Sequence, residues 1–238
     1  MLRAAGTRHD RENLTRFGIM TEQEQQKRAF GVSMAKLKAI AKRLGKDHEL
    51  AASLWATGWY EARMLAALVD DPDLVTGAQM DRWAKDFDNW GICDTVCFCL
   101  FDRVSPELAF QKVSTWCARK TEFVRRGGLA LLASLALHDK VSSDAPFLQA
   151  LSALERAITE PPDDRHLVQK GASWAVRGVG RRNARLHKAA VALAKRLADS
   201  DEAPARWIGK DALRELESAR VVAAVARRSR ATSKRAVT

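Results

Sequence analysis

Apolar residues recur at helical spacing through most of the chain, and the alternating β-branched runs that mark strands do not occur. Ala, Leu, Arg, Lys and Glu dominate these segments, and all of them are good helix formers. Ser33 and Gly45 bracket one such segment, because serine caps helix starts and glycine ends helices, and Pro106 stands at the first position of another. The sequence therefore predicts an all-α protein with about a dozen helices joined by short polar turns.

Pairs of predicted helices recur along the chain. Residues 61–68, 124–131 and 168–175 each place a cation before a run of small residues. Spacing of roughly 30–45 residues is typical of stacked two-helix repeats, which curve into a solenoid with a concave inner face, whereas an ordinary helical bundle is the alternative. The key positions of these repeats, separated by 31, 32 and 44 residues, are Arg63, Asp94, Arg126 and Lys170.

The charge balance narrows the range of partners. The chain has 238 residues, with 40 Lys and Arg against 29 Asp and Glu, which gives a formal net charge of +11 and a pI near 9.9. A folded basic protein suits a polyanion, either nucleic acid or an anionic membrane surface. No apolar run is long enough for a transmembrane helix, and the first residues lack the apolar stretch of a secretory signal.

Composition also indicates how the chain is organised. With 47% apolar residues the chain is expected to fold, and its length fits one large domain or two small ones. We expect a single domain over residues 1–224, in which about the first 12 residues are loosely ordered. A basic flexible tail, residues 225–238, is expected to follow, either solvated or helping to hold nucleic acid. Four cysteines are too few for a disulfide scaffold, which points to a reducing compartment.

Residues 88–97 form the segment with the densest candidate chemistry. Trp90 and Asp94 are four residues apart, so they share one face of a helix that is otherwise apolar. A carboxylate on an apolar helix costs free energy of folding unless it pairs with a cation or has a functional role. Stacked repeats would bring Arg126 and Lys170 near it, together with Trp174, which shares the face of Lys170.

Two indoles, a carboxylate and a cation make chemical sense together. Indole faces attract cations, and a carboxylate stabilises developing positive charge and can polarise a water molecule. A cationic N-alkylated purine in DNA, whose sugar becomes an oxocarbenium as the base leaves, is a substrate that needs both. The alternative is a buried Asp–Arg pair with Trp90 and Trp174 filling the core.

Other candidate features are weaker. Cys93, Cys97 and Cys99 lack the spacing and the nearby histidine that a zinc site needs, so they are interpreted as buried thiols. The Gly127-Gly128 pair inside a helix predicts close packing by another helix or, less readily, by a ligand.

Four segments together resemble one known family. Residues 89–94 look like its Trp-plus-Asp motif, residues 123–127 like its aromatic-x-x-Arg helix, and residues 168–177 like its Lys-x-x-x-Trp-x-x-Arg helix. Residues 30–33, which lead into a basic helix, resemble its N-terminal segment. In this order and spacing, from about residue 17 to residue 220, the chain resembles the AlkD-like DNA alkylation repair family of HEAT-like-repeat DNA glycosylases.

This resemblance implies a C-shaped HEAT-like repeat α-solenoid that holds duplex DNA against a basic concave face. It implies a base-excision repair glycosylase that hydrolyses the N-glycosidic bond of cationic N3- or N7-alkylpurines without flipping the lesion base. Asp94 would then be the catalytic carboxylate, and Trp90 and Trp174 would contact the deoxyribose and backbone of the lesion. Four cations would hold phosphates along the same face: Arg126, Lys170, Arg63 and Arg177.

No cofactor or metal is expected, because the leaving group already carries positive charge. We expect a monomer in the bacterial cytoplasm, associated with the nucleoid when bound to DNA. Two positions depart from the family pattern: Phe123 stands where a tryptophan is often found, and Gly91 stands where an acid is common and could loosen the helix that aims Asp94. The alternatives are a non-catalytic DNA-binding repeat protein and a protein–protein scaffold.

Overall fold

The computed structural model describes the backbone of residues 1–235 and the side chains of residues 1–228. This part of the chain contains fifteen α-helices, one short 3-10 helix and no strand, which confirms the all-α prediction. The chain divides into two compact units, the first spanning Met1–Ser105 and the second beginning at Pro106. No helix in the described residues is both long and apolar enough to span a membrane.

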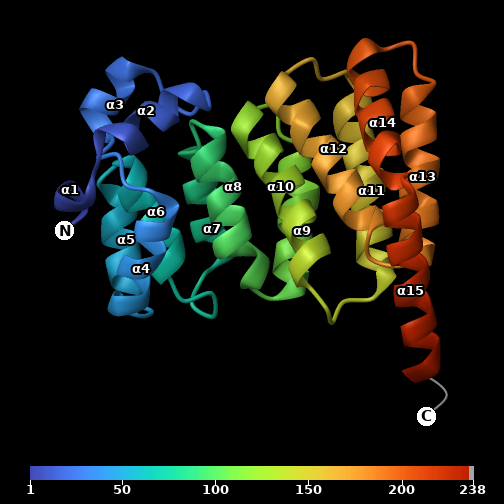
Figure 1. The fold of residues 1–238 in the computed structure, drawn as a ribbon, viewed down its shortest axis with the longest axis horizontal. Helices are drawn as coiled ribbons and strands as arrows, with labels where there is room; N and C mark the ends of the chain where they lie inside the picture. Colours follow the sequence, from blue (N-terminus) through green and yellow to red (C-terminus); the bar gives the residue numbers. More distant parts are fainter. Residues whose placement is uncertain (236–238) are drawn as a thin grey trace. The chain divides into compact units, whose positions relative to one another are not determined.

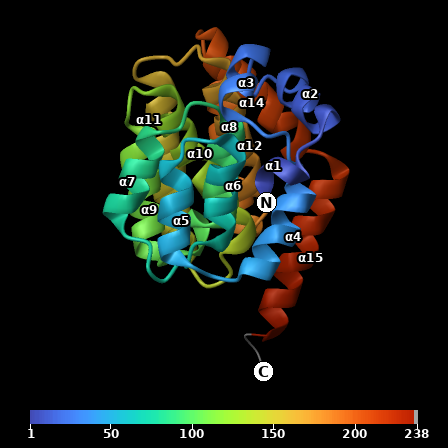
Figure 2. The same cartoon turned by 90° about the vertical axis from the view of Figure 1, so that its left-hand side faces the viewer.

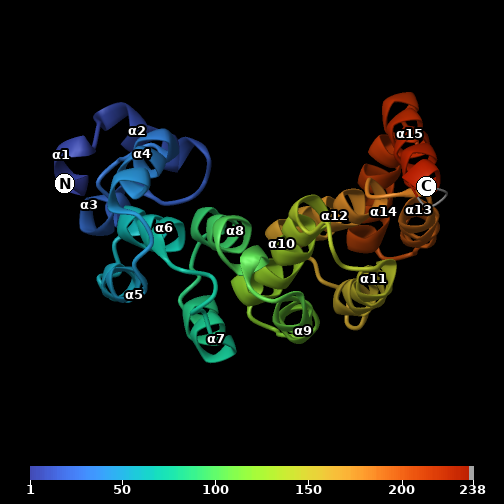
Figure 3. The same ribbon diagram turned by 90° about the horizontal axis from the view of Figure 1, so that it is seen from below.

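The first unit is built from antiparallel helix pairs. Helices α5 and α6 pack together, and α6 also contacts α4 and α8 (Figure 2). Seen along the helices, α6 and α8 lie in one row and α5 and α7 in the other (Figure 3). The elements of this unit are α1 (Leu2–Ala5), α2 (Arg8–Arg16), α3 (Glu22–Arg28), α4 (Met34–Leu44), α5 (His48–Ala56), α6 (Tyr60–Val69), α7 (Gly77–Lys85), α8 (Trp90–Cys99) and the 3-10 helix η1 (Phe101–Arg103).

The second unit repeats this two-row pattern. Helices α10, α12 and α14 pack side by side in one row, and α11 contacts both α9 and α13 in the other (Figure 1, Figure 3). Two rows of helices bury one face of each row against the other, as stacked repeats require. The elements of this unit are α9 (Pro106–Cys117), α10 (Glu122–His138), α11 (Asp144–Thr159), α12 (His166–Gly180), α13 (Ala184–Ala198), α14 (Ala203–Leu216) and α15 (Ala219–Arg235).

Glycines mark the points where neighbouring helices of the second unit approach most closely. A Cβ atom on Gly128 would lie 2.8 Å from the backbone nitrogen of Cys117, so α9 and α10 meet at this residue. A Cβ atom on Gly209 would lie 2.2 Å from the backbone nitrogen of Ala198, where α13 and α14 meet. The prediction of close helix packing at the glycine pair in α10 is therefore confirmed at Gly128.

The N-terminal segment forms two helices that contact the rest of the first unit. Residues 2–5 and 8–16 are helical, and the backbone of Thr7 donates a 2.7 Å hydrogen bond to the carbonyl of Gly31. The buried carboxylate of Glu61 accepts hydrogen bonds from the backbone N–H groups of Phe30, Gly31 and Val32, at 2.8, 2.6 and 3.1 Å. The hydrogen bond of Thr7 and those of Glu61 therefore connect the first residues, through residues 30–32, to α6. These contacts join residues far apart in the chain, so the local sequence does not predict them.

The segment from Val225 onward, which the sequence predicts to be a basic flexible tail, is part of α15 as far as Arg235. Val221 and Val225 are buried, so one face of this helix packs on the second unit. Residues 236–238 of the expected tail lie outside the described residues.

Candidate functional site

All the site residues predicted from the sequence lie on one row of helices in their unit. In the first unit this row is α6 and α8, and in the second it is α10, α12 and α14. The convergence of Asp94 with Trp174, which lie in different units, stays a prediction. The predicted residues are Arg63 on α6, Trp90 and Asp94 on α8, Arg126 on α10, and Lys170, Trp174 and Arg177 on α12.

Trp90 and Asp94 occupy the half-exposed side of α8. Asn89 caps this helix, since its side-chain oxygen accepts a 2.9 Å hydrogen bond from the backbone N–H of Ile92. Trp90 is the first residue of the helix, and its indole N–H donates a 3.2 Å hydrogen bond to the carbonyl of Phe17. Trp90 and Asp94 are each partly exposed and four residues apart, so an indole and a carboxylate share one side of a helix whose other residues are largely buried.

Burial of α8 changes the pKa of one of its thiols. Burial, followed by the neighbouring Cys93 and then the charge of Asp94, raises the pKa of the Cys97 thiol. Cys93 and Cys97 are both fully buried, as interpreted from the sequence. No set of three or more His, Cys, Asp or Glu side chains gathers as a metal-binding group anywhere in the described part of the chain.

Gly91 has a packing role that sequence reasoning missed. A Cβ atom at this position would lie 2.7 Å from the hydroxyl of Tyr60, 3.2 Å from the side-chain oxygen of Asn89 and 3.4 Å from Ile19. The helix runs unbroken from Trp90 to Cys99, so the glycine does not interrupt it. The absence of a side chain at residue 91 therefore allows α8 to approach α6 closely, and the space that a longer side chain would need is occupied by Tyr60.

Arg63 is held within the first unit. Its guanidinium donates a 3.2 Å hydrogen bond to the carbonyl of Asp86, lies 3.6 Å from the Asp86 carboxylate and sits 5.1 Å from the centre of the Trp55 ring. The same carboxylate accepts a 2.8 Å hydrogen bond from the indole of Trp55. With only 14% of its side chain exposed, Arg63 links α5, α6 and the end of α7. Its predicted contact with phosphate stays a prediction.

Arg125 and Arg126 are both buried at the start of α10. Arg125 donates hydrogen bonds to the carbonyl of Ala157 at 2.9 Å and to the carboxylate of Asp163 at 2.6 Å. Arg126 donates to the carbonyl of Leu167, at the start of α12, and its stem lies beside Gly171. The structure therefore joins Arg126 to the helix that carries Lys170 and Trp174, through a contact between residues far apart in the sequence.

Asp163 organises the loop before α12. Its carboxylate pairs with Arg125 and Arg165, and its side chain is only 2% exposed. Burial disfavours the charged carboxylate, but hydrogen bonds from Arg165 and Arg125 outweigh that effect, so the pKa of Asp163 lies below its usual value. This ionic cluster holds the first turn of α10 and α12 in register.

The surface of α12 carries three of the site residues predicted from the sequence. Lys170 is exposed, and Trp174 is partly exposed, as is Phe123 on α10. Arg177 pairs with Asp211 at 2.5 Å and with Glu215 at 2.9 Å, both on α14. Sequence reasoning missed these two acids, although their spacing of four residues matches the spacing of Arg177 and Arg181 and could have indicated facing helices.

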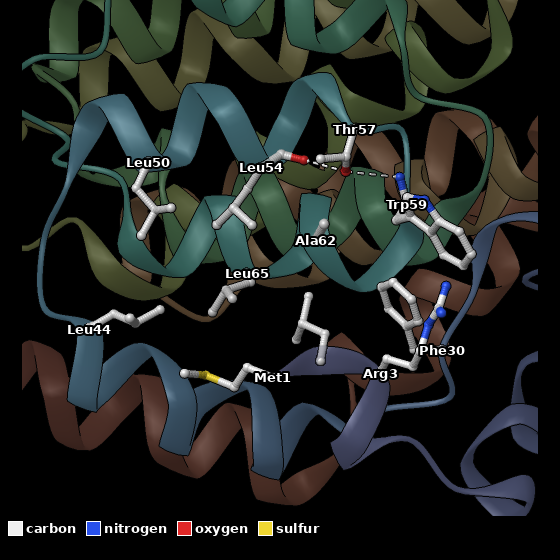
Figure 4. A pocket seen from close by; sticks show the side chains of 11 residues that line it. Met1, Arg3, Phe30, Leu44, Leu50, Leu54, Thr57, Trp59, Ala62 and Leu65 are labelled. Atoms are coloured by element: carbon white, nitrogen blue, oxygen red, sulfur yellow. Dashed lines mark hydrogen bonds between the residues drawn. The ribbon is translucent and has the colours of Figure 1, made fainter.

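An apolar pocket of about 470 Å³ lies elsewhere, in the first unit (Figure 4). Side chains of α4, α5 and α6 line it, including Leu44, Leu54 and Leu65, and Phe30 stacks on Trp59 at one end with 4.2 Å between ring centres (Figure 4). None of the predicted site residues contributes to its lining. This pocket therefore does not belong to the candidate site.

Comparison with known proteins now identifies the relatives of this chain. Residues 1–216 match the family described as "DNA alkylation repair enzyme". The protein belongs to this family. The resemblance found in the sequence is thus confirmed, and the family associates the chain with DNA repair.

A solved structure supports the same assignment of fold. It is described as "a new family of proteins related to the HEAT-like repeat DNA glycosylases with affinity for branched DNA structures". It is 22% identical in sequence, the match covers 90% of this chain and 91% of that chain, and the TM-score is 0.68. The likeness confirms a HEAT-like repeat fold. A search among curated proteins finds no match.

Proposed function

We propose that this member of the DNA alkylation repair family is a DNA glycosylase that removes cationic N3- or N7-alkylpurines from duplex DNA. The observation that carries the proposal is the pair formed by Trp90 and Asp94, which are partly exposed and four residues apart on α8. A carboxylate and an indole on one side of a helix suit a reaction centre that becomes positively charged. The family description, DNA alkylation repair, supports alkylated DNA as the substrate in this proposal.

The reaction would proceed with the chemistry already present in the lesion. The bond between C1′ of the deoxyribose and the purine nitrogen breaks, and both electrons of that bond go to the base. The base therefore leaves as a neutral alkylpurine, and the sugar becomes an oxocarbenium. The Asp94 carboxylate stabilises this cation and orients a water molecule, whose oxygen bonds to C1′ as the carboxylate accepts its proton.

The indoles and cations would hold the damaged strand. In this proposal Trp90 and Trp174 lie against the deoxyribose and backbone of the lesion, without flipping the base. Among the four predicted phosphate contacts, Lys170 is the most accessible because its side chain is exposed, whereas Arg126 is buried and Arg63 is largely covered. We therefore assign Lys170 the larger share of direct phosphate binding, with Arg126 and Arg63 acting mainly through the positions of their helices.

The test is release of 7-methylguanine and 3-methyladenine from methylated duplex DNA. We expect Asp94→Asn to lose most of the release, by a factor of about 100 or more, because it removes the charge that stabilises the oxocarbenium. Trp174→Ala should weaken release less severely. Asp73→Asn is the matched control, since Asp73 is exposed in the loop between α6 and α7, and it should behave like the wild type.

The decisive comparison needs DNA binding to be measured in parallel. Asp94→Asn should bind the duplex as the wild type does, so that lost release reports on chemistry. A wild-type protein that binds methylated DNA but releases no base above the spontaneous rate would contradict the glycosylase proposal.

A second candidate is a non-catalytic protein that binds branched DNA. The observation that favours it is the affinity for branched DNA described for the similar solved structure. In that case the protein would bind a four-way junction more tightly than a linear duplex of equal length. It would also show no difference in base release between the wild type and Asp94→Asn.

A further inference from the structure

An arginine-rich cavity in the second unit is lined by residues of α12, α14 and α15 and of the turn between α14 and α15. It has a volume of about 390 Å³, which is large enough for a phosphate group and its bound water. We call it the α14–α15 cavity. Its lining residues are Arg177, Asp211, Arg214, Glu215, Ser218 and Arg220.

Two carboxylates hold the arginines in place around this cavity. Asp211 pairs with Arg177 at 2.5 Å, accepts a 2.6 Å hydrogen bond from the hydroxyl of Ser173 and also pairs with Arg214. Glu215 pairs with Arg177 at 2.9 Å and also with Arg181. Each acid thus serves two cations, which fixes guanidinium groups that would otherwise be free to rotate.

The cavity keeps an excess of positive charge after these pairs are counted. Three arginines, at residues 177, 214 and 220, line the cavity together with two carboxylates, so the lining has a formal net charge of +1, and Arg181 beside it adds a further positive charge. The side chain of Arg214 is 80% exposed, and Arg220 is also exposed. Burial is the largest cause that lowers the pKa of Arg181, and repulsion from Arg177, Arg220 and Arg228 lowers it further. An anion placed here would relieve that repulsion.

The cavity also continues the functional face of α12. Lys170, Trp174, Arg177 and Arg181 follow one another at intervals of four, three and four residues, so they lie along one side of the helix. At about 1.5 Å per residue this line is about 16 Å long, which is comparable with a few nucleotides of one strand. The α14–α15 cavity lies at its Arg177–Arg181 end.

We propose that the α14–α15 cavity binds a backbone phosphate of the DNA, held by Arg214 and Arg220 with Arg177 behind them. This inference rests on the proposed function only in taking DNA as the partner. It adds a phosphate contact beyond the residues predicted from the sequence. Guanidinium groups bind phosphate oxygens through paired N–H groups, which lysines cannot do, and this explains why the cluster uses arginine alone as its cation.

The experiment measures duplex DNA affinity against salt concentration for the full chain, by fluorescence anisotropy. Removing two cations that contact phosphate should lower the magnitude of the slope of log K against log salt by about 2. The test variant is the double substitution Arg214→Ala and Arg220→Ala. The matched control is Arg185→Ala with Lys188→Ala, which removes the same charge from exposed positions of α13.

We expect the slope to fall in the test variant and to remain near the wild-type value in the control, with both proteins unfolding at the wild-type temperature. Equal slopes for the two double variants would overturn the proposal. A second arm adds inorganic phosphate at ionic strength matched with chloride. If phosphate bound to the wild type and not to the test variant, while the duplex slope did not change, the cavity would serve a small anion and the DNA assignment would be wrong.

The outcome is separable from that of the proposed function. If Arg214 and Arg220 contribute to DNA affinity but the wild type releases no base, phosphate binding by the cavity is supported and the glycosylase proposal is contradicted. If the wild type releases base but its DNA affinity does not depend on these arginines, the glycosylase proposal is supported and phosphate binding by the cavity is contradicted.

Discussion

At the scale of single residues, the missing side chain of Gly91 allows α8, the helix that carries Asp94, to pack closely against Tyr60 of α6. We expect Gly91→Ala to cost about 1–3 kcal/mol of stability, because its Cβ atom would overlap the hydroxyl of the buried Tyr60. Removing that hydroxyl with Tyr60→Phe should abolish most of the cost, since alanine is otherwise the better helix former by about 1 kcal/mol.

This prediction is measured as a double-mutant cycle in thermal or urea unfolding. Four proteins are compared: the wild type, Gly91→Ala, Tyr60→Phe and the double variant. If Gly91→Ala cost the same in both backgrounds, the close approach to Tyr60 would not be the reason for the glycine.

At the scale of secondary-structure elements, Asp163 links the starts of α10 and α12 through Arg125 and Arg165. We expect Asp163→Asn to reduce the stability by about 3 kcal/mol at pH 7, because it leaves the buried Arg125 without its carboxylate. Asp164→Asn is the control, since its side chain is exposed.

The effect should depend on pH in a defined direction. The folded pKa of Asp163 is depressed, so its contribution is complete above the unfolded value of about 4 and is lost as the pH falls through the folded value. Urea unfolding at pH 7 and pH 3 checks this. The difference between the wild type and Asp163→Asn should narrow at pH 3, and an unchanged difference would show that the charge of Asp163 is not what stabilises the loop.

The elements also show which parts of the fold local sequence can predict. Helical spacing and caps such as Asn89 are local signals, so the helices and the row that carries the candidate site were predictable. The burial of Arg126 was not, because it depends on the carbonyl of Leu167, 41 residues away. The order of the first residues depends in the same way on Glu61, which lies about 30 residues from the backbone it holds.

At the scale of the whole molecule, the proposed reaction needs no metal. The alkylated base leaves as a neutral group, so its departure requires no Lewis acid. We expect EDTA to leave the rate of base release within about twofold of the untreated rate, which a release assay at fixed ionic strength measures. A loss of activity that zinc or magnesium restores would contradict this expectation.

The burial of the native thiols has a practical consequence for following the protein at work. Cys93, Cys97 and Cys117 are buried and therefore inaccessible to maleimide dyes. Burial also raises the pKa of the Cys97 thiol, and that of the Cys117 thiol to about 12. Cys99 is half-buried, and burial raises its pKa too. A cysteine introduced at the exposed Ser152 of α11, on the opposite row from the candidate site, would therefore react far faster than the native four. One fluorophore there could report the arrival of DNA in real time while every side chain of the proposed site remains unaltered.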